Sequence, residues 1–150
     1  VVNREPGSVL LLIGEGKDKE KLKRKAEQWG LHEKVVFYGA TDQIERLYWA
    51  MDVFIMPSRF EGLPVTGVEA QASGVPCLFS DAITEECRIN SNSCFLSLST
   101  PAIEWAKMIL QIRNSESRAI GASVVRAAGF DMTDVARRIE TFYLKAESYG

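Results

Sequence analysis

Residues 53–79 read VFIMPSRFEGLPVTGVEAQASGVPCLF, and this stretch decides the fold. The runs Val53 to Met56 and Pro76 to Phe79 are short and apolar, as is typical of strands buried in a parallel sheet. Between them, Pro64 to Ser73 has the spacing of a helix, with proline at a position that suits the first helical turn. The stretch therefore predicts a strand, a helix and a second strand parallel to the first.

The same alternation precedes this stretch. Val9 to Ile13 is wholly apolar and ends at Gly14, which predicts a strand buried on both faces. Another strand is predicted at Lys34 to Tyr38, and helices are predicted at Lys17 to Trp29 and at Gln43 to Ala50. Four strands that alternate with helices predict an α/β fold, namely a Rossmann-like, doubly wound parallel sheet.

Helices dominate the last third of the sequence. The predicted elements are, in order, a short helix at Thr84 to Arg88, a strand at Cys94 to Leu98, and helices at Pro101 to Ile112 and at Glu116 to Ala128. The last of these helices is predicted to end at Gly129, and Asp131 is predicted to be the N-cap of a terminal helix. The apolar stripe of the terminal helix consists of Val135, Ile139, Phe142 and Ala146. Because no internal repeat or linker interrupts the chain, we expect residues 1–150 to form one domain that these helices close.

The composition suits one compact domain. The chain has 150 residues, 46% of them hydrophobic, which is enough for a core without metals or disulfides. Its 18 basic and 20 acidic residues give a net charge of −2, which offers no general attraction for nucleic acid. The cysteines Cys77, Cys87 and Cys94 lack the C-x-x-C spacing of a zinc site, which predicts reduced structural thiols.

Hydropathy and the start of the chain bear on localisation. No apolar run approaches the length of about 20 residues that spans a bilayer. Residues 1–7, VVNREPG, contain neither an initiator methionine nor a signal-peptide pattern. We therefore expect a cytoplasmic domain that forms part of a longer protein.

Ligands of a doubly wound sheet bind beyond the carboxyl ends of the strands, so the loops there hold the candidate site. These loops are Gly14 to Gly16, Gly39 to Thr41, Pro57 to Leu63 and Ser80 to Ala82. The third is the longest and the most polar, with Ser58, Arg59 and Glu61. Gly62 beside them lets the backbone approach a ligand closely, so we expect the site at this loop.

The helix that follows this loop, with Pro64 as its first residue, predicts an anion site. The N–H groups of Val65, Thr66 and Gly67 and the positive end of the helix dipole face the loop. This arrangement favours a phosphate group as the ligand.

Two stripes run along the same helix. The polar stripe consists of Thr66, Glu69 and Ser73. The apolar stripe, predicted to face the sheet, consists of Val65, Val68 and Ala72. A carboxylate at Glu69 can accept hydrogen bonds from two vicinal hydroxyls, such as those of a ribose. Glu61, on the loop, is expected to lie closer than Glu69 to the group attached to the phosphate.

The surroundings of the two glutamates resemble a known family. In FEGLPVTGVEAQASGVP, residues 60–76, Glu61 and Glu69 stand eight positions apart. This resembles the paired-glutamate motif of the retaining GT-B glycosyltransferases of family four, the group 1 glycosyltransferases, especially those that build capsular and extracellular polysaccharides. Three further segments resemble the family in order and spacing: LLIGEG at 11–16, VVFYGATDQIERLYWAMDVFIMPS at 35–58 and FDMT at 130–133.

The resemblance implies a role for each candidate residue. Glu61 is implied as the catalytic residue, in contact with the donor sugar near the reaction centre, and Glu69 as the residue that holds the ribose. The other residues implied in substrate binding are Gly14, Gly16, Gly39, Ser58, Gly62, Leu63, Val65 and Thr66. The backbone from Gly62 to Thr66 is implied to hold sugar and diphosphate, and the loops at Gly14 and Gly39 to approach the nucleotide and its base.

The sequence departs from the family pattern in three places. Many members have a second glycine where this chain has Pro64, and proline has no N–H to offer a ligand. The family's basic pair, which neutralises the diphosphate, precedes a strand like Val9 to Ile13 and is not present, so we expect the sequence to begin just after it. Residues 91–99, SNSCFLSLS, lack the glycines that many members have there.

The function implied by the resemblance is that of the donor-binding carboxyl-terminal half of a retaining glycosyltransferase. We expect a nucleotide-diphosphate sugar, specifically a UDP-sugar, as donor and a glycan or lipid-linked acceptor in polysaccharide biosynthesis. The acceptor would bind an amino-terminal domain absent from this sequence, so this half alone is expected to be inactive. No metal and no cofactor is implied, and we expect peripheral contact of the longer protein with the inner face of the membrane.

Several residues favour simpler roles. The run Gly14 to Gly16 is no dinucleotide fingerprint, because Lys19 occupies the place of the third glycine. His32 lies in a polar turn, which predicts a surface residue. The basic run Lys17 to Lys25 predicts a solvated helix face rather than a lipid-binding one. Packing, rather than sugar stacking, is predicted for the tryptophans Trp29, Trp49 and Trp105.

Two rival functions stay open on the sequence alone. The same sheet could form a non-catalytic sugar-nucleotide sensor or interaction module, or one half of a sugar-nucleotide epimerase. An acceptor domain with basic residues elsewhere in the gene product would favour the transferase over the sensor. Product analysis would separate an epimer from a glycoside.

Overall fold

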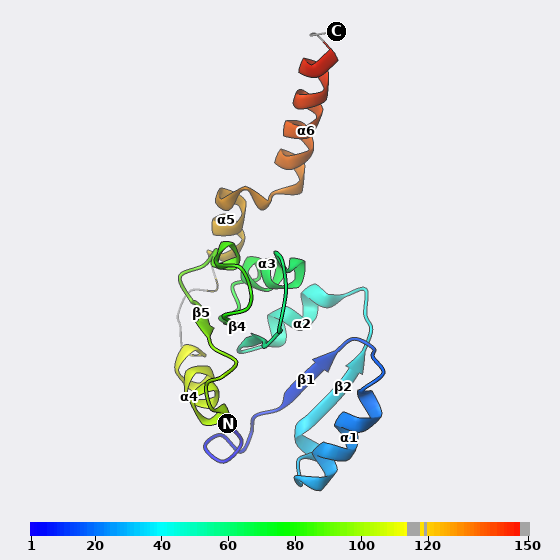
Figure 1. Ribbon diagram of the computed structural model, residues 1–150, viewed down its shortest axis with the longest axis vertical. Coiled ribbons are helices and arrows are strands. Elements are labelled where there is room, and N and C mark those ends of the chain that lie inside the picture. The colour runs from blue at the N-terminus through cyan, green and yellow to red at the C-terminus, as the bar shows by residue number, and fades with distance from the viewer. Residues whose placement is uncertain (114–117, 119, 148–150) are drawn as a thin grey trace. The chain divides into compact units, whose positions relative to one another are not determined.

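The computed structural model describes residues 1–113, 118 and 120–147 (Figure 1). The chain divides into two compact units, Val1–Ile44 and Glu45–Gly150. Parallel strands and helices occur in both units. The α/β class predicted from the sequence is therefore confirmed.

The unit Val1–Ile44 contains a two-stranded parallel sheet. Its elements are strand β1 (Leu10–Ile13), helix α1 (Lys19–Gln28), the 3-10 turn η1 (His32–Lys34) and strand β2 (Val35–Gly39). Leu10 lies opposite Val35, and the register shifts after Leu12, so that Ile13 lies opposite Gly39. His32, in η1, is exposed, as the sequence predicted.

Strand β1 is less buried than its apolar sequence predicted. Leu10 is 47% exposed, and the three residues after it are half-buried. Among the described residues of this unit, β1 pairs with β2 in a two-stranded sheet. The prediction of a strand buried on both faces is therefore wrong at this position.

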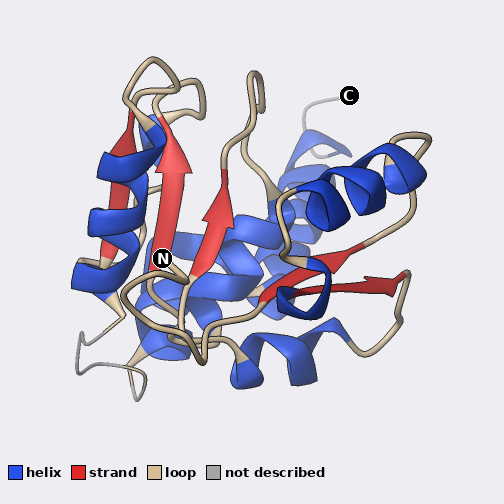
Figure 2. Ribbon diagram, turned by 90° about the horizontal axis from the view of Figure 1, so that it is seen from below, coloured by secondary structure: helices blue, strands red, loops and turns tan. Residues whose placement is uncertain are grey.

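In the unit Glu45–Gly150, three parallel strands lie side by side in the order β3-β4-β5 (Figure 2). The elements of this part are helix α2 (Ile44–Ala50), strand β3 (Phe54–Met56), helix α3 (Val65–Ala72), strand β4 (Cys77–Ser80), the 3-10 turn η2 (Glu85–Cys87) and strand β5 (Ser93–Leu96). Every residue of the central strand β4 is buried. This strand therefore has the burial on both faces that its apolar sequence predicted.

The core of this unit contains a row of four aromatic rings. Tyr48 on α2 meets Phe54 on β3 edge-on, with ring centroids 5.9 Å apart. Phe79 on β4 lies 6.3 Å from Phe54 and 5.4 Å from Phe95 on β5. Edge-to-face and tilted contacts at such distances are favourable, so the row joins α2 to all three strands.

The cysteines are free thiols, as predicted, with Cys77 and Cys87 buried and Cys94 half-buried. Burial raises the pKa of the Cys77 thiol, and the neighbouring Cys87 raises it further. Burial also raises the pKa of the Cys87 thiol. Both thiols therefore stay protonated and serve as small core residues.

Helix α3 buries a different face from the predicted one. The buried residues of the helix are Gly67, Ala70 and Gln71. A Cβ added at Gly67 would lie 3.0 Å from the Phe79 ring and 3.2 Å from Cys87 Sγ, so valine does not fit on that face. Val65 is accordingly 69% exposed. The prediction that the stripe of Val65, Val68 and Ala72 faces the sheet is wrong.

The side-chain amide of Gln71 is fully buried and hydrogen-bonded at both ends. Its Nε2 donates to the carbonyl oxygens of Gly67, at 3.0 Å, and Cys87, at 2.8 Å. Its Oε1 accepts from the Ile89 N–H at 3.0 Å, the Asn90 N–H at 2.9 Å and the Ser93 hydroxyl at 2.7 Å. A buried amide satisfied in this way is tolerated in a core, and it ties residues 87–93 to α3.

The last elements are helix α4 (Ala102–Ile112), helix α5 (Gly121–Val125), the π-helical turn η3 (Arg126–Phe130) and helix α6 (Met132–Glu147). The helix predicted from Glu116 begins at Gly121, and residues 114–117 and 119 lie outside the described residues. Gly129, which was predicted to end that helix, has a φ of 90° and breaks the helical geometry.

Two glycines allow the backbones around α3 and α5 to meet. Gly74, which follows α3, has a φ of 74°, and a Cβ there would lie 2.3 Å from the carbonyl oxygen of Arg118. A Cβ at Gly121 would lie 2.5 Å from the Gly74 nitrogen. Any larger residue at either position would push the two segments apart.

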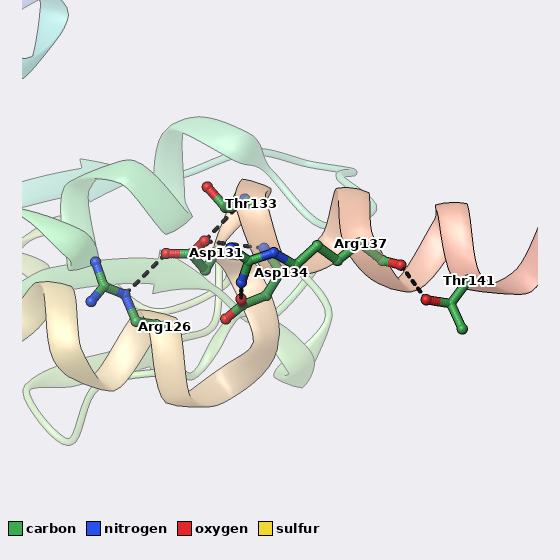
Figure 3. A network of polar contacts seen from close by, with 6 residues as sticks. All are labelled: Arg126, Asp131, Thr133, Asp134, Arg137 and Thr141. Carbon is green, nitrogen blue, oxygen red and sulfur yellow. Dashed lines mark hydrogen bonds and ion pairs between the residues drawn. The ribbon is translucent and has the colours of Figure 1, made fainter.

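Asp131 caps α6, as predicted (Figure 3). Its Oδ1 accepts from the N–H groups of Thr133, at 2.9 Å, and Asp134, at 3.2 Å. Its Oδ2 accepts from Arg126 Nε at 3.0 Å. The Asp134 N–H, then the Thr133 N–H and Arg126, hold the pKa of Asp131 below its ordinary value.

The apolar stripe predicted for α6 is not packed inside the unit. Val135 is half-buried, whereas Ile139 is exposed and Phe142 is 69% exposed. The side chain of Ala146 lies outside the described residues. The pattern therefore predicted the helix and its apolar face but not the exposure of that face.

Two of the three tryptophans are exposed, which makes their predicted packing wrong. Trp29 follows the end of α1, where Lys25 Nζ lies 5.6 Å from its ring centre. Trp49 follows Tyr48, and neighbouring residues on a helix point in different directions, so the burial of Tyr48 turns Trp49 outward. Trp105 is half-buried, and its Nε1 donates to the Ser97 carbonyl at 3.1 Å.

Candidate functional site

The candidate site lies on the loop that connects β3 to α3, beyond the carboxyl end of β3. Ser58, Glu61, Gly62 and Leu63 lie on this loop, and Val65, Thr66 and Glu69 lie on the helix that follows it. Glu61 forms an isolated parallel bridge with Ile83, a buried residue in the segment that follows β4. The loop is therefore fixed to the end of the neighbouring strand.

The carboxylate of Glu61 is held by a serine that is itself anchored. The Ser58 hydroxyl donates to Glu61 Oε1 at 3.1 Å. The hydroxyl of Ser80, a fully buried residue of β4, donates to the backbone carbonyl of Ser58. This chain of hydrogen bonds links Glu61 to the central strand of the sheet.

The amino terminus of α3 leaves backbone donors free. Pro64 occupies the N-cap position without a side-chain cap, and its carbonyl accepts from the N–H groups of Gly67, at 3.0 Å, and Val68, at 3.2 Å. The predicted donor Gly67 is therefore already used inside the helix, because its N–H closes the first turn. In the part of the chain that the structure describes, the N–H groups of Val65 and Thr66 have no partner, and they lie at the positive end of the helix dipole.

Glu69 lies one turn further along α3, and a tyrosine holds its carboxylate. The hydroxyl of Tyr48 on α2 lies 3.1 Å from Glu69 Oε2 and 3.2 Å from the carbonyl oxygen of Thr66. Burial, together with the negative charge of Glu69, raises the pKa of Tyr48. Tyr48 therefore remains a neutral hydrogen-bond donor.

Tyr48 contacts the candidate site through Glu69 and was not among the residues predicted for the site from the sequence. Its position on the predicted helix Gln43 to Ala50 reads as an apolar core position, and its ring does pack in the core. The signal that could have found it is the hydroxyl, because a buried tyrosine hydroxyl needs a hydrogen-bond partner and Glu69 is a polar residue on the neighbouring helix.

The three glycines predicted to approach the nucleotide lie in the unit Val1–Ile44. Gly14 follows β1 and has a φ of 114°, and Gly39 ends β2 with a φ of 86°. The Gly14 N–H donates to the Gly39 carbonyl at 2.8 Å, so the ends of the two strands are joined. Gly16 lies two residues further along the first loop. The approach of these three glycines to a nucleotide stays a prediction.

Among residues 1–113, 118 and 120–147, no three His, Cys, Asp or Glu side chains gather where they could hold a metal ion. None of the helices in the described part of the chain has both the length and the hydropathy needed to cross a bilayer.

Comparison with known proteins gives a family match and close relatives. The family model described as "Glycosyl transferases group 1" matches residues 2–119. The chain is 45% identical over 101 residues to EpsF of Bacillus subtilis (strain 168), and this match covers 67% of this chain and 26% of EpsF. It is 33% identical over 95 residues to the UDP-Gal:alpha-D-GlcNAc-diphosphoundecaprenol alpha-1,3-galactosyltransferase of Escherichia coli, which covers 63% of this chain and 23% of that protein. The chain thus spans about a quarter of the length of these relatives.

The fold is also found among solved structures. The crystal structure of Anabaena HepE in complex with UDP superimposes with a TM-score of 0.76 at 20% sequence identity. The match covers 93% of this chain and 42% of that chain. At this level of identity the likeness shows a shared fold, which agrees with the parallel α/β arrangement described above.

Proposed function

This chain belongs to the group 1 glycosyl transferases, and we propose that it forms the donor-binding domain of a retaining GT-B enzyme. In this proposal it binds a nucleotide-diphosphate sugar, and the sugar passes to an acceptor held by another domain. The chain spans about a quarter of the length of its curated relatives, which leaves ample length for such a domain.

One observation carries the proposal. Glu61 and Glu69, spaced as in the family motif, are each held by a hydroxyl, that of Ser58 on the same loop for the first and that of Tyr48 on α2 for the second. Between them along the chain lies a helix terminus with free N–H groups. Two fixed carboxylates on either side of an anion-binding terminus suit a ligand with hydroxyls at both ends and phosphates between them, as a sugar nucleotide has.

Each part of the donor is assigned to nearby residues. We assign the ribose hydroxyls to Glu69 and the sugar to Glu61. The diphosphate is assigned to the N–H groups of Val65 and Thr66, with the backbone of Gly62 and Leu63 beside the sugar. Pro64 contributes no N–H, so the donors must come from the residues on either side of it.

The transfer itself breaks the bond between the anomeric carbon and the diphosphate oxygen and forms a bond from that carbon to an acceptor oxygen. The electron pair of the broken bond stays on the diphosphate oxygen, which takes up the proton that the acceptor hydroxyl loses. Charge that develops on the departing diphosphate is stabilised by preorganised N–H groups and the helix dipole, so we expect no requirement for a metal ion. Glu61 orients the sugar and steadies the positive charge that develops at the anomeric carbon.

We propose a UDP-sugar as donor and a glycan or lipid-linked acceptor of polysaccharide biosynthesis. Support for uridine comes from the Escherichia coli relative, whose name specifies UDP-Gal, and from the UDP complex of Anabaena HepE. The same relative's name specifies an acceptor on diphosphoundecaprenol. A lipid-linked acceptor lies at a membrane surface, so we expect the longer protein to be cytoplasmic with peripheral membrane contact.

Calorimetric titration of the chain with UDP, GDP and ADP tests the proposal. We expect weak binding with a preference for UDP, and no turnover of a UDP-sugar by this chain alone. Circular dichroism under the same conditions provides the control for folding. Absence of heat with all three nucleotides, from a folded chain, would refute a nucleotide site.

A further inference from the structure

Tyr48 joins two elements at the candidate site. It comes from α2, its side chain is 2% exposed, and its hydroxyl reaches Glu69 Oε2 on α3 at 3.1 Å. Glu69 itself is exposed, so its carboxylate is available to a ligand while the Tyr48 hydroxyl holds one of its oxygens. An exposed glutamate without such a contact samples many rotamers, and fixing it on binding costs conformational entropy.

The single proton of Tyr48 has two acceptors within reach, Glu69 Oε2 and the carbonyl oxygen of Thr66. The charged carboxylate is the stronger acceptor, because hydrogen bonds to ionised groups are shorter and stronger than neutral ones. The Thr66 carbonyl also lies within a helix, where it accepts from the backbone. The Tyr48 hydroxyl therefore donates its hydrogen bond to Glu69.

Packing contacts fix the position of the Tyr48 ring. It packs edge-on against Phe54, in the row of rings that crosses the three strands. Arg118 donates to the backbone carbonyls of Trp49, at 2.9 Å, and of Met51. These two hydrogen bonds hold the carboxyl end of α2. Because these contacts leave the hydroxyl little freedom to move, it can hold the flexible Glu69 side chain in one orientation.

We propose that Tyr48 is a positioning residue for the donor: it holds the Glu69 carboxylate in the orientation that accepts the two ribose hydroxyls. This inference rests on the proposed function, because it takes Glu69 as the ribose-binding residue. Tyr48 makes no contact with the nucleotide in this scheme and acts only through Glu69. Its effect should therefore depend on the presence of the ribose hydroxyls.

Tyr48→Phe in the full-length protein tests the inference, because the change removes the hydroxyl and keeps the packed ring. The probes are UDP and 2′-deoxy-UDP, with dissociation constants from calorimetry. Loss of one hydrogen bond of this kind corresponds to about a three- to tenfold weaker affinity. We expect that loss for UDP and a smaller loss for 2′-deoxy-UDP, since the deoxy nucleotide makes fewer bonds to Glu69.

Two controls separate positioning from a general structural effect. Tyr143→Phe removes a hydroxyl from an exposed tyrosine on α6 and should leave both affinities unchanged. In a Glu69→Ala background, adding Tyr48→Phe should cause no further loss, because the residue through which it acts is gone. Equal weakening of both nucleotides by Tyr48→Phe, or an additive loss in the double variant, would overturn the positioning role.

The remaining outcomes are also decisive. A wild-type protein that binds no nucleotide refutes the proposed function, and the role of Tyr48 falls with it. A wild-type protein that binds UDP while Tyr48→Phe binds it equally well refutes the role of Tyr48 alone. If Tyr48→Phe does not fold, Glu69→Asp replaces it, because the shorter side chain draws the carboxylate away from Tyr48; unchanged UDP affinity in that variant would contradict the inference.

Discussion

The hydroxyl of Ser58 lies 3.1 Å from Oε1 of Glu61, and the backbone carbonyl of Ser58 accepts a hydrogen bond from the buried Ser80. Glu61 is thus tied to β4 through a single serine. The equivalent tie for Glu69 comes from a different helix, through Tyr48. Each of the two carboxylates therefore depends on its own support, and the two supports can be removed separately.

Removal of the Ser58 hydroxyl should impair the chemical step more than donor binding. Ser58→Ala frees the Glu61 carboxylate to rotate, and we expect kcat of the full-length transferase to fall about three- to tenfold, as suits one lost hydrogen bond to a charged group. The donor KM should change little, since we assign the ribose to Glu69, which this variant leaves intact. Steady-state kinetics with a UDP-sugar checks this, with Ser123→Ala on the exposed side of α5 as the control. An unchanged kcat in Ser58→Ala would contradict the role given to this serine.

The two glutamates should give different kinetic signatures. Under the proposed assignment, Glu69→Ala removes ribose contacts made in the ground state and the transition state alike, so we expect the donor KM to rise more than it does in Glu61→Ala. Glu61→Ala should instead lower kcat, because the sugar loses its orientation at the reaction centre. Initial rates over a range of donor concentrations in the full-length enzyme separate the two effects. If neither change affects the kinetics, the assignment of both residues fails.

Gly74→Ala should destabilise the unit Glu45–Gly150. The alanine would have to adopt a φ of 74°, and its Cβ would overlap the carbonyl oxygen of Arg118. Strain and overpacking together are expected to lower the free energy of unfolding by about 2–4 kcal/mol. Urea denaturation followed by fluorescence measures the change. Gly7→Ala is the matched control, because a Cβ there meets nothing within 4 Å, and a similar loss in both variants would argue against the close contact.

The cap of α6 should respond to acid. Since hydrogen bonds lower the pKa of Asp131 in the folded chain, its charge stabilises the helix above the unfolded pKa of about 3.9. This contribution is lost as the pH falls through the lower folded value. Circular dichroism from about pH 7 down to about pH 2 should show more helix in the wild type than in Asp131→Asn at neutral pH and convergence in acid. A constant difference over the whole range would mean that the charge of Asp131 does not contribute.

The order of strands and helices could be predicted because it depends on local patterns. Short apolar runs set the strands, and apolar periodicity set the helices, so most predicted boundaries lie within a few residues of the observed ones. Gly129 and Asp131 mark a helix end and a helix start through backbone preferences that act over a few residues. Such signals are contained in the sequence near the residues that they affect.

The buried face of α3 could not be predicted in this way. A hydrophobicity pattern places Val65 inside, but the helix buries Gly67, where Phe79 and Cys87 from elsewhere in the chain leave no room for a larger side chain. The same limit applies to Tyr48, whose partner is 21 positions away. Contacts between distant segments decide which polar and small residues are buried, and no local pattern records them.

The amide of Gln71 has a consequence for any attempt to move this site into another protein. The stretch from Ser58 to Gly74 reads as a portable module, with both glutamates and the helix terminus on one continuous piece of chain. Its helix, however, completes the hydrogen bonding of Gln71 only with residues 87–93. A graft that omits that second segment would leave the Gln71 amide oxygen without partners and its Nε2 with the Gly67 carbonyl alone, so the smallest transplantable piece extends through β5.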